Sequence, residues 1–276
     1  MSEEFSLRFW GVRGSTPTPG TGTLRYGGET SCLEIRAGNA RMLVDCGSGA
    51  RNLGMELCQK KQSADMDILF THTHLDHICG LPFFWPAFDP DSQINAWAGH
   101  FEEPELKLAD VVNRIMSPPV FPLAAKSLKA LSFCDYQVGS ELPVCGDATV
   151  RTMRLNHPGG ACGYRIEFQG KVICIITDHE HGNVEIDAKL PGFVEGADIM
   201  IYDAMYTDEE YETYIGWGHS TWQKAVELAR EAEVKTPVLF HHDPRRVDDE
   251  LDEIGTAAAD VYPGTLVAKE GLILKP

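Results

Sequence analysis

The sequence predicts a single α/β domain in which helices cover the outer faces of β-sheets. Short apolar runs of strand type alternate with amphipathic patterns of helical spacing along the whole chain. No low-complexity segment or long linker divides the 276 residues, so we expect one domain over residues 1–276. An apolar fraction of 43% and a charged fraction of 24% are typical of a globular protein with a sizeable core.

The strand candidates fall into two series separated by a long middle segment. The first series comprises residues 5–10, 31–37, 41–44, 67–70 and 94–98, and the second comprises residues 149–155, 163–168, 172–176, 198–202, 238–240 and 265–268. Helical spacing of apolar and charged residues predicts helices over residues 50–61, 104–116, 221–233 and 248–261. Since helices lie between the strands, we expect them to pack on the outside of the sheets.

The segment Ser-Pro-Pro-Val-Phe-Pro at residues 117–122 cannot be helical, because its prolines lack the amide hydrogen and restrict their neighbours. It should form a stiff loop. The loop is either a surface connection or a wall of a substrate cleft.

The charge balance bears on partners and location. A net charge of -17 repels polyanions, and no basic patch offsets it, which argues against a long nucleic acid as partner. No apolar run reaches the length of about 18 residues that spans a membrane. The acidic start Met-Ser-Glu-Glu does not resemble an export signal, so we expect cytoplasmic localisation. The oligomeric state stays open, with a homodimer among the alternatives.

The eight cysteines are widely spaced and form no Cys-x-x-Cys pair. Several lie in apolar surroundings: Cys32, Cys46, Cys79 and Cys174. We therefore expect reduced thiols that pack as small hydrophobic side chains.

The motif His-Thr-His-Leu-Asp-His at residues 72–77 directly follows an apolar run. In an extended segment alternate side chains point the same way, so His72 and His74 can bind one metal ion from a single face. A turn can then bring Asp76 and His77 toward a second ion. One buried histidine is usually a core residue, but three histidines with an aspartate at this spacing indicate a metal site.

A metal site of this kind needs further ligands downstream, because the motif alone cannot complete two coordination spheres. Three candidates each follow an apolar run: His157, Asp178 and His241. Sheets commonly present functional groups where their strands end. Each candidate by itself is weak, since strand ends often carry polar residues.

The motif and the three later residues resemble the metallo-β-lactamase fold over about residues 5–270. The resemblance implies a four-layer αββα sandwich with the site at one rim. It also implies two divalent metal ions. Zinc is the expected metal, and manganese or iron are the alternatives. By this likeness His72, His74 and His157 would hold the first metal, Asp76, His77 and His241 the second, and Asp178 would bridge them.

The segment Leu-Val-Asp-Cys-Gly at residues 43–47 resembles a strand-to-turn motif of the same superfamily. The resemblance implies that Asp45 braces the metal-binding loops from behind the ligands. Alternatively, Asp45 caps a turn before a helix.

Three further stretches resemble tRNase Z and its phosphodiesterase relatives: residues 162–166, 197–206 and 218–221. The last contains His-Ser-Thr, and the likeness implies that His219 protonates the leaving group. Ser220 and Gln223 have the spacing of a capping box, which would fix His219 just before a helix. A histidine that merely packs against that helix is the alternative.

Two departures from this branch stand out. Bacterial tRNase Z enzymes carry a long arm between the third and fourth metal motifs, but only twenty residues separate His157 from Asp178 here, and two strand candidates fill them. No such arm fits, which favours a small phosphodiester over a folded tRNA. Thr-Asp-His-Glu also replaces the usual Gly-Asp-Thr at residues 177–180. His179 and His181 are then either outer contacts of the site or residues of an exposed loop, and the role of His242 stays open.

Residues 10–17 and 26–32 resemble bacterial metallo-β-lactamase-fold proteins linked to cyclic nucleotide phosphodiesterase activity. Glycines with hydroxyl residues let a backbone approach an anionic oxygen, although such a loop is often only a turn. The substrate-contact candidates are Arg13, Ser15, Thr16 and Ser31, with Arg25 as a second nearby cation.

The resulting hypothesis is an enzyme that hydrolyses a small phosphodiester, such as a cyclic nucleotide, by a metal-bridging hydroxide. Asp76 would orient the hydroxide, and His219 would donate the proton to the departing oxygen. Three alternatives remain: a carboxyl-ester or lactone hydrolase, a tRNA 3'-processing endonuclease without the usual arm, and a non-catalytic metal-binding protein that senses a nucleotide.

Overall fold

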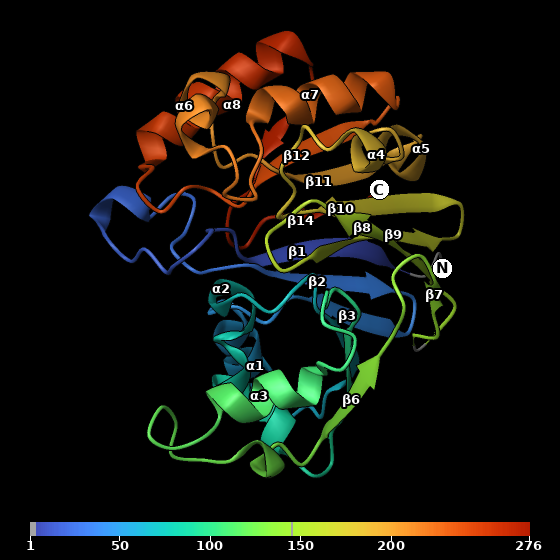
Figure 1. Cartoon of the computed structure of the whole chain (residues 1–276). Coiled ribbons are helices and arrows are strands. Elements are labelled where there is room, and N and C mark those ends of the chain that lie inside the picture. The colour runs from blue at the N-terminus through green and yellow to red at the C-terminus, as the bar shows by residue number, and fades with distance from the viewer. Residues whose placement is uncertain (1–3, 145) are drawn as a thin grey trace.

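Two β-sheets of seven strands each form the centre of the computed structural model, which describes residues 4–144 and 146–276 (Figure 1). Residues 1–3 of the acidic start and Cys145 lie outside the described residues. The first sheet has the order β14 (Ile273–Leu274), β1 (Phe5–Gly11), β2 (Cys32–Ala37), β3 (Ala40–Val44), β4 (Asp65–Leu69), β5 (Gln93–Ala98) and β6 (Leu131–Asp135). The second has the order β13 (Leu266–Val267), β12 (Thr236–Phe240), β11 (Ile199–Asp203), β10 (Lys171–Ile176), β9 (Ala161–Phe168), β8 (Thr149–Leu155) and β7 (Glu141–Leu142).

Each sheet is antiparallel in one half and parallel in the other. The pairs from β3 to β6 are parallel, as are those from β10 to β13. Parallel strands place their carboxyl ends at one edge of a sheet, where functional groups commonly lie. The predicted ligands follow strands of these halves, except His157, which follows the antiparallel β8.

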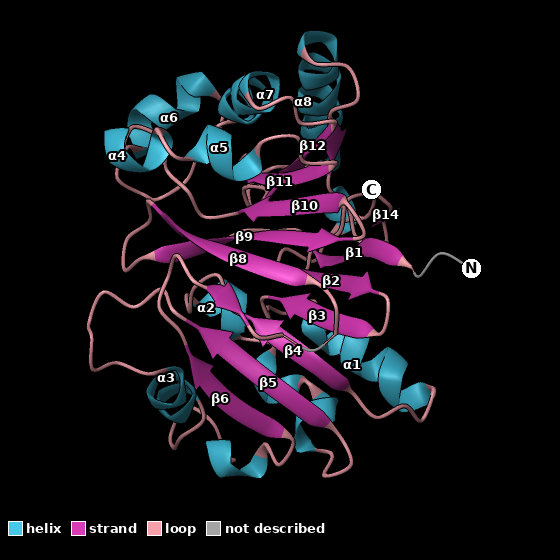
Figure 2. Cartoon of the chain, turned by 90° about the vertical axis from the view of Figure 1, so that its right-hand side faces the viewer, coloured by secondary structure: helices cyan, strands magenta, loops and turns pink. Residues whose placement is uncertain are grey.

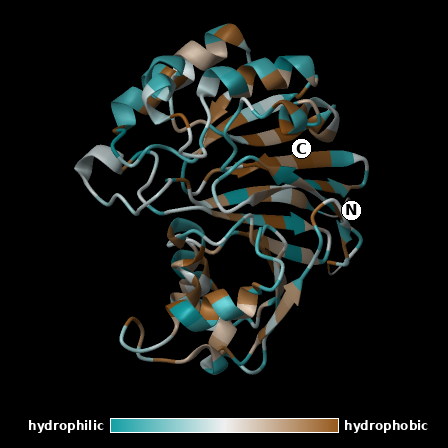
Figure 3. Cartoon of the chain, viewed as in Figure 1, coloured by the Kyte–Doolittle hydropathy of each residue, from teal (hydrophilic) through white to brown (hydrophobic). Residues whose placement is uncertain are grey.

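Three buried clusters show the layering. One lies between the two sheets, where Phe9 contacts Phe240 with ring centroids 6.1 Å apart. The other two lie on the outer faces, under α1 (Ala50–Gln59) and α3 (Leu108–Ile115) on the first sheet, and under α5 (Leu190–Val194), α7 (Trp222–Glu231) and α8 (Asp248–Val261) on the second. Figure 2 shows the sheets between the two groups of helices, and Figure 3 shows that apolar residues concentrate on the strands. The expected αββα sandwich is confirmed.

The structure contains every strand predicted from the sequence, with ends shifted by at most two residues. The sequence reasoning missed β6, β7 and β14, because two of them have only two residues and β6 is partly exposed with no clean apolar run. It also missed the short helices α2 (Leu75–Ile78), α4 (Val184–Asp187), α5 and α6 (Asp208–Tyr214), and the 3-10 turns η1 (Thr21–Thr23), η2 (Leu81–Phe83), η3 (Trp85–Phe88) and η4 (Ala125–Ser127). The helix expected from residue 104 begins only at Leu108.

Residues 117–120 form a non-helical turn, as expected. Phe121 packs on Phe83 with ring centroids 5.6 Å apart, so the segment is anchored beside η2. Cys32, Cys46 and Cys174 are buried and Cys79 is partly buried, and the cysteines among the described residues are free thiols. None of the helices in residues 4–144 and 146–276 has both the length and the apolar character needed to cross a bilayer.

Candidate metal centre

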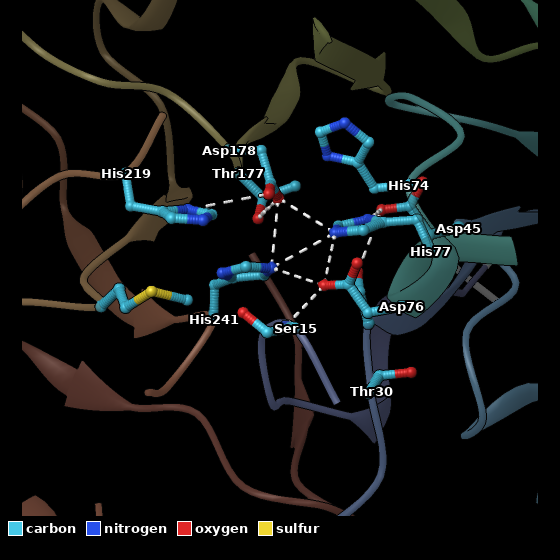
Figure 4. Close-up of polar contacts among 12 residues, drawn as sticks. Ser15, Thr30, Asp45, His74, Asp76, His77, Thr177, Asp178, His219 and His241 are labelled. Carbon is cyan, nitrogen blue, oxygen red and sulfur yellow. Dashed lines mark hydrogen bonds and ion pairs between the residues drawn. The ribbon is translucent and has the colours of Figure 1, made fainter. Parts of the chain in front are cut away.

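The structure brings all seven predicted ligand side chains together at the edge where the two sheets meet. Figure 4 shows His74, Asp76, His77, Asp178 and His241 among them. The loop after β4 supplies His72 and His74, and the short helix α2 that follows supplies Asp76 and His77. The strands β8, β10 and β12 of the other sheet each end just before one more member, and these are His157, Asp178 and His241. Two sheets and four loops therefore converge on one point.

The first group of ligand atoms consists of His72, His74 and His157. Nε2 of His157 lies 3.0 Å from Nδ1 of His74. Oδ1 of Asp178 faces this group, 3.8 Å from Nε2 of His72 and 3.8 Å from Nε2 of His157.

The second group consists of Asp76, His77 and His241. Nε2 of His77 lies 3.2 Å from Nε2 of His241, and both nitrogens lie within 3.3 Å of Oδ2 of Asp76. The other oxygen of Asp178, Oδ2, is 3.2 Å from His77 and 3.4 Å from His241. Asp178 thus faces each group with one oxygen, which is the arrangement that a shared ligand needs.

The donor set fits two divalent cations. Nε2 of His72 is buried without a hydrogen-bond partner, which is costly unless a cation occupies its lone pair. Imidazole nitrogens with carboxylate oxygens suit zinc, manganese or iron. Burial lowers the pKa of His72 well below 6.5 and that of His157 to about 4, so both rings carry the free lone pair that coordination requires. The cluster therefore has the composition and geometry of a dinuclear metal centre.

Three residues at the site have a strained backbone conformation that directs their side chains toward the cluster. Asp45, Asp178 and His241 have φ values of 61°, 57° and 61°, in the left-handed region that non-glycine residues rarely adopt. Each of them lies one or two positions after the last residue of a strand. Such strain costs of order 1–3 kcal/mol per residue and persists mainly at functional sites.

Two glycines allow the backbone to approach the histidines closely. A Cβ at Gly14 would lie 2.5 Å from Nδ1 of His241, and one at Gly218 would lie 2.2 Å from Nδ1 of His157. The carbonyl oxygen of Gly218 is also 2.8 Å from Nδ1 of His157, which leaves Nε2 of that ring to face the cluster.

Asp45 lies behind the ligands, as the resemblance implies. Its Oδ2 is 2.7 Å from Nδ1 of His77, and its Oδ1 accepts a hydrogen bond from the amide of Thr71. The hydroxyl of Ser31 donates to Asp45 at 3.0 Å. Asp45 therefore orients His77 rather than capping a turn alone.

His219 lies at the edge of the cluster, just before α7. Its Nδ1 is 2.8 Å from Oδ2 of Asp203 and 3.7 Å from Oδ1 of Asp178. The N-cap of α7 is Thr221, which accepts from the amide of Lys224, so the capping box expected at Ser220 is wrong by one residue. The hydroxyl of Ser220 instead lies 2.9 Å from Nδ1 of His181.

Sequence reasoning missed Asp203, a fully buried carboxylate at the end of β11. Its oxygens accept from the amides of Asp178, Met205 and Ser220 as well as facing His219. The signal that identified Asp178, an acidic residue at the end of an apolar run, was present in Ile-Met-Ile-Tyr-Asp and could have found it.

The family described as a beta-lactamase superfamily domain matches residues 40–242, which include all seven clustered residues. The chain belongs to this superfamily. A Ribonuclease Z of Methanopyrus kandleri is 26% identical over 324 aligned positions, covering 100% of this chain and 99% of that protein. Because the alignment exceeds 276 positions, it includes residues of the relative that have no counterpart here.

Two solved structures share the fold along nearly the whole chain. The metallo-β-lactamase fold protein YhfI from Bacillus subtilis superposes with a TM-score of 0.76 at 19% identity, covering 99% of this chain and 100% of YhfI. The short form of human tRNase Z superposes with a TM-score of 0.68 at 20% identity, covering 98% of each chain. The family match confirms the metallo-β-lactamase superfamily and, with the relatives named Ribonuclease Z, the expectation of a metal-dependent hydrolase. Within the superfamily, the chain is similar to proteins named Ribonuclease Z and tRNase Z.

The N-terminal loop contributes fewer side chains to the site than the sequence suggested. Arg13 is fully buried, and its guanidinium donates to the carbonyls of Gly27 and Arg246, so it cannot reach a substrate. The Ser31 hydroxyl is likewise buried against Asp45. Arg25 pairs with Asp249 at 2.7 Å.

Ser15 and Thr16 are exposed, and the backbone amide of Ser15 donates to Oδ2 of Asp76 at 2.7 Å. The loop thus reaches the cluster through its backbone.

Two of the histidines with open roles, His179 and His242, make buried contacts. His179 is fully buried, so the exposed-loop interpretation is wrong for it, and Nε2 of His242 donates to the carbonyl of Ala268 at 2.8 Å.

A pocket adjoins the first ligand group on its open side. His72 and His74 form one wall, and residues 158–160 form another. Glu102 and Glu103 also line the pocket, so its rim is acidic. An acidic rim disfavours a large polyanion near His74.

Proposed function

We propose that this chain is a dinuclear phosphodiesterase, with zinc as its metal, that hydrolyses a small phosphodiester such as a cyclic nucleotide. The observation that carries the proposal is the pairing of His219 with Asp203 beside the seven-residue cluster. A cluster alone would serve many hydrolases, whereas an oriented proton donor at its edge suits departure of a poor alkoxide leaving group.

In this proposal His72, His74 and His157 hold one metal, and Asp76, His77 and His241 hold the other. Asp178 is shared between them, because each of its oxygens faces one group. When bound, the two cations would lower the pKa of the attacking water and offset charge on the phosphate oxygens.

The chain's own residues then position groups and move one proton. The Asp203 carboxylate accepts from Nδ1 of His219, so Nε2 is the nitrogen that holds the proton for the departing oxygen. The Asp76 carboxylate, held by the amide of Ser15, orients the attacking water.

Three features favour a small substrate over a folded tRNA. The strands β9 and β10, which lie between His157 and Asp178, are joined by residues 169–170 alone, so no arm protrudes there. The net charge of -17 opposes a long polyanion. Glu102 and Glu103 line the pocket beside His74.

Processing of a tRNA 3' end is the second candidate. The names of the relatives favour it, since the Methanopyrus kandleri protein, 26% identical, is a Ribonuclease Z. For that activity, this chain would have to bind tRNA without the arm and despite electrostatic repulsion between its negative net charge and the tRNA phosphates.

A turnover panel on protein reconstituted with zinc, manganese or iron separates the candidates. The substrates are 3',5'- and 2',3'-cyclic nucleotides, cyclic dinucleotides, a precursor tRNA and a lactone. We expect turnover of at least one small phosphodiester and none of the precursor tRNA. Cleavage of the tRNA alone, or of the lactone alone, would overturn the proposal, as would cyclic nucleotide binding without hydrolysis. An Asp178→Asn protein purified in parallel reports contaminating activity.

A further inference from the structure

Glu180 is a buried carboxylate two residues beyond Asp178, with 6% of its surface exposed. Its Oε1 accepts hydrogen bonds from the Tyr211 hydroxyl at 3.0 Å and from the Gly216 amide at 2.6 Å. Its Oε2 accepts from the Gly218 amide at 2.7 Å. Both oxygens are thus directed at the segment before α7, and hydrogen bonds to an ionised acceptor are the stronger kind.

The segment that Glu180 contacts affects the placement of both His219 and His157. Gly218 directly precedes His219, and its carbonyl is 2.8 Å from Nδ1 of His157. Gly216 and Gly218 both have φ values of 90°, which only glycine adopts readily. Because glycine has many accessible backbone conformations, this segment needs external contacts to keep one of them.

The backbone of Glu180 is itself fixed to the β8 end. Its amide donates to the carbonyl of Asn156 at 2.8 Å, and the Asn156 side chain donates back to the Glu180 carbonyl at 2.8 Å. Asn156 directly precedes His157. Glu180 therefore connects the strand end carrying His157, the strand end carrying Asp178 and the segment carrying His219.

We propose that Glu180 is a positioning residue, which holds residues 216–219 so that His219 stays aligned with the shared carboxylate of Asp178. This inference rests on the proposed function for its kinetic consequence, but the placement of the segment stands independently of any activity. The Thr-Asp-His-Glu sequence, which departs from the usual Gly-Asp-Thr, then supplies its own acceptor for this segment.

Hydrogen–deuterium exchange on metal-free protein tests the placement. Glu180→Gln replaces one acceptor oxygen with a donor, so either Gly216 or Gly218 loses its partner. We expect the amides of residues 216–219 to exchange about tenfold faster, while those of β11 keep their rates. Glu212→Gln, an exposed change on α6, is the matched control and should leave these rates unchanged. Unchanged exchange in Glu180→Gln would overturn the inference.

Kinetics on the metal-loaded protein test the alignment. A displaced proton donor matters most for a poor leaving group, so kcat on an alkyl diester should fall by about 10-fold in Glu180→Gln, with KM little changed. The loss on a nitrophenyl diester should be clearly smaller. Equal losses on both substrates would show a merely structural role and refute the alignment.

Two outcomes separate this inference from the proposed function. If wild-type protein hydrolyses neither diester, the proposed function fails, whereas the exchange measurement still decides the placement of residues 216–219. If Glu180→Gln does not fold, Tyr211→Phe removes one donor and leaves the carboxylate in place. It should produce smaller changes in the same direction, and their absence would overturn the inference.

Discussion

Oδ2 of Asp203 lies 2.8 Å from Nδ1 of His219, and the same oxygen accepts a hydrogen bond from the backbone amide of Asp178. One buried carboxylate thereby fixes the proposed proton donor relative to the proposed shared ligand. The opposite oxygen accepts from the amides of Met205 and Ser220, so both oxygens face donors.

Asp203→Asn should lower kcat by about 10- to 100-fold while the protein still binds two metal ions. Whichever way the new amide points, its NH2 group faces donors and disturbs His219. Steady-state kinetics with metal analysis checks this, and Glu209→Gln, exposed on α6, serves as the control. A variant with wild-type kcat would show that His219 needs no such partner.

His219→Ala should retain both metals and lose on the order of 100-fold in kcat on an alkyl diester. The loss should be smaller on a nitrophenyl diester, whose leaving group departs without a proton. Metal content by elemental analysis and kcat on both substrates are the measurements. Equal rate losses on the activated and unactivated diesters would remove the proton-donor role.

Gly14→Ala should destabilise the protein by about 1–3 kcal/mol and weaken metal binding. The new Cβ would meet Nδ1 of His241 and the Met205 side chain, each at 2.5 Å. Gly20→Ala, in the same loop, is the matched control because its Cβ would meet nothing within 4 Å. Denaturant unfolding and metal titration compare the two, and identical curves would contradict the close approach.

Metal binding should release protons at neutral pH. Burial lowers the pKa of His241, but Asp178 and its neighbouring carboxylates outweigh burial and raise it to about 9. Since coordination needs the unprotonated ring, apparent metal affinity should rise with pH until about 9. Calorimetry in buffers of different ionisation enthalpy measures the protons released, and a pH-independent affinity would contradict this.

The same shift affects the metal-free protein. Because the folded pKa of His241 exceeds its ordinary value of 6.5, its protonation contributes stability that is fully present below that pH. This contribution is lost as the pH rises through about 9. The free energy of unfolding of metal-free protein should therefore decline over that interval.

The cluster could be predicted because the motif at residues 72–77 and the three later ligands each follow an apolar run, and such runs are visible in the sequence. Asp178 and His241 are examples, and the structure places both at strand ends. Asp203 carries the same signal, which marks it as a candidate, but an aspartate at a strand end has no fixed role without its partner. Its role depends on His219, which lies 16 positions away.

The contacts of loops could not be predicted in the same way. Arg13 and Ser31 lie in glycine- and hydroxyl-rich stretches that suggested contact with an anion, yet both side chains are turned into the protein. Glu180 belongs to the Thr-Asp-His-Glu stretch, which departs from the usual Gly-Asp-Thr. Its carboxylate accepts hydrogen bonds from the backbone amides of Gly216 and Gly218. Backbone amides carry no residue identity, so no sequence pattern shows which carboxylate they will meet.

The division of the cluster between the two sheets affects when activity can arise during synthesis. Neither ligand group is complete within one sheet, because His157 and His241 follow strands of the second sheet, whereas their partners lie in the segment after β4, which includes α2. A growing chain therefore lacks a complete catalytic apparatus until β12 has left the ribosome and joined its neighbours. We therefore expect nascent fragments that end before β12 to lack His241, so the two ligand groups can be complete only in nearly full-length protein.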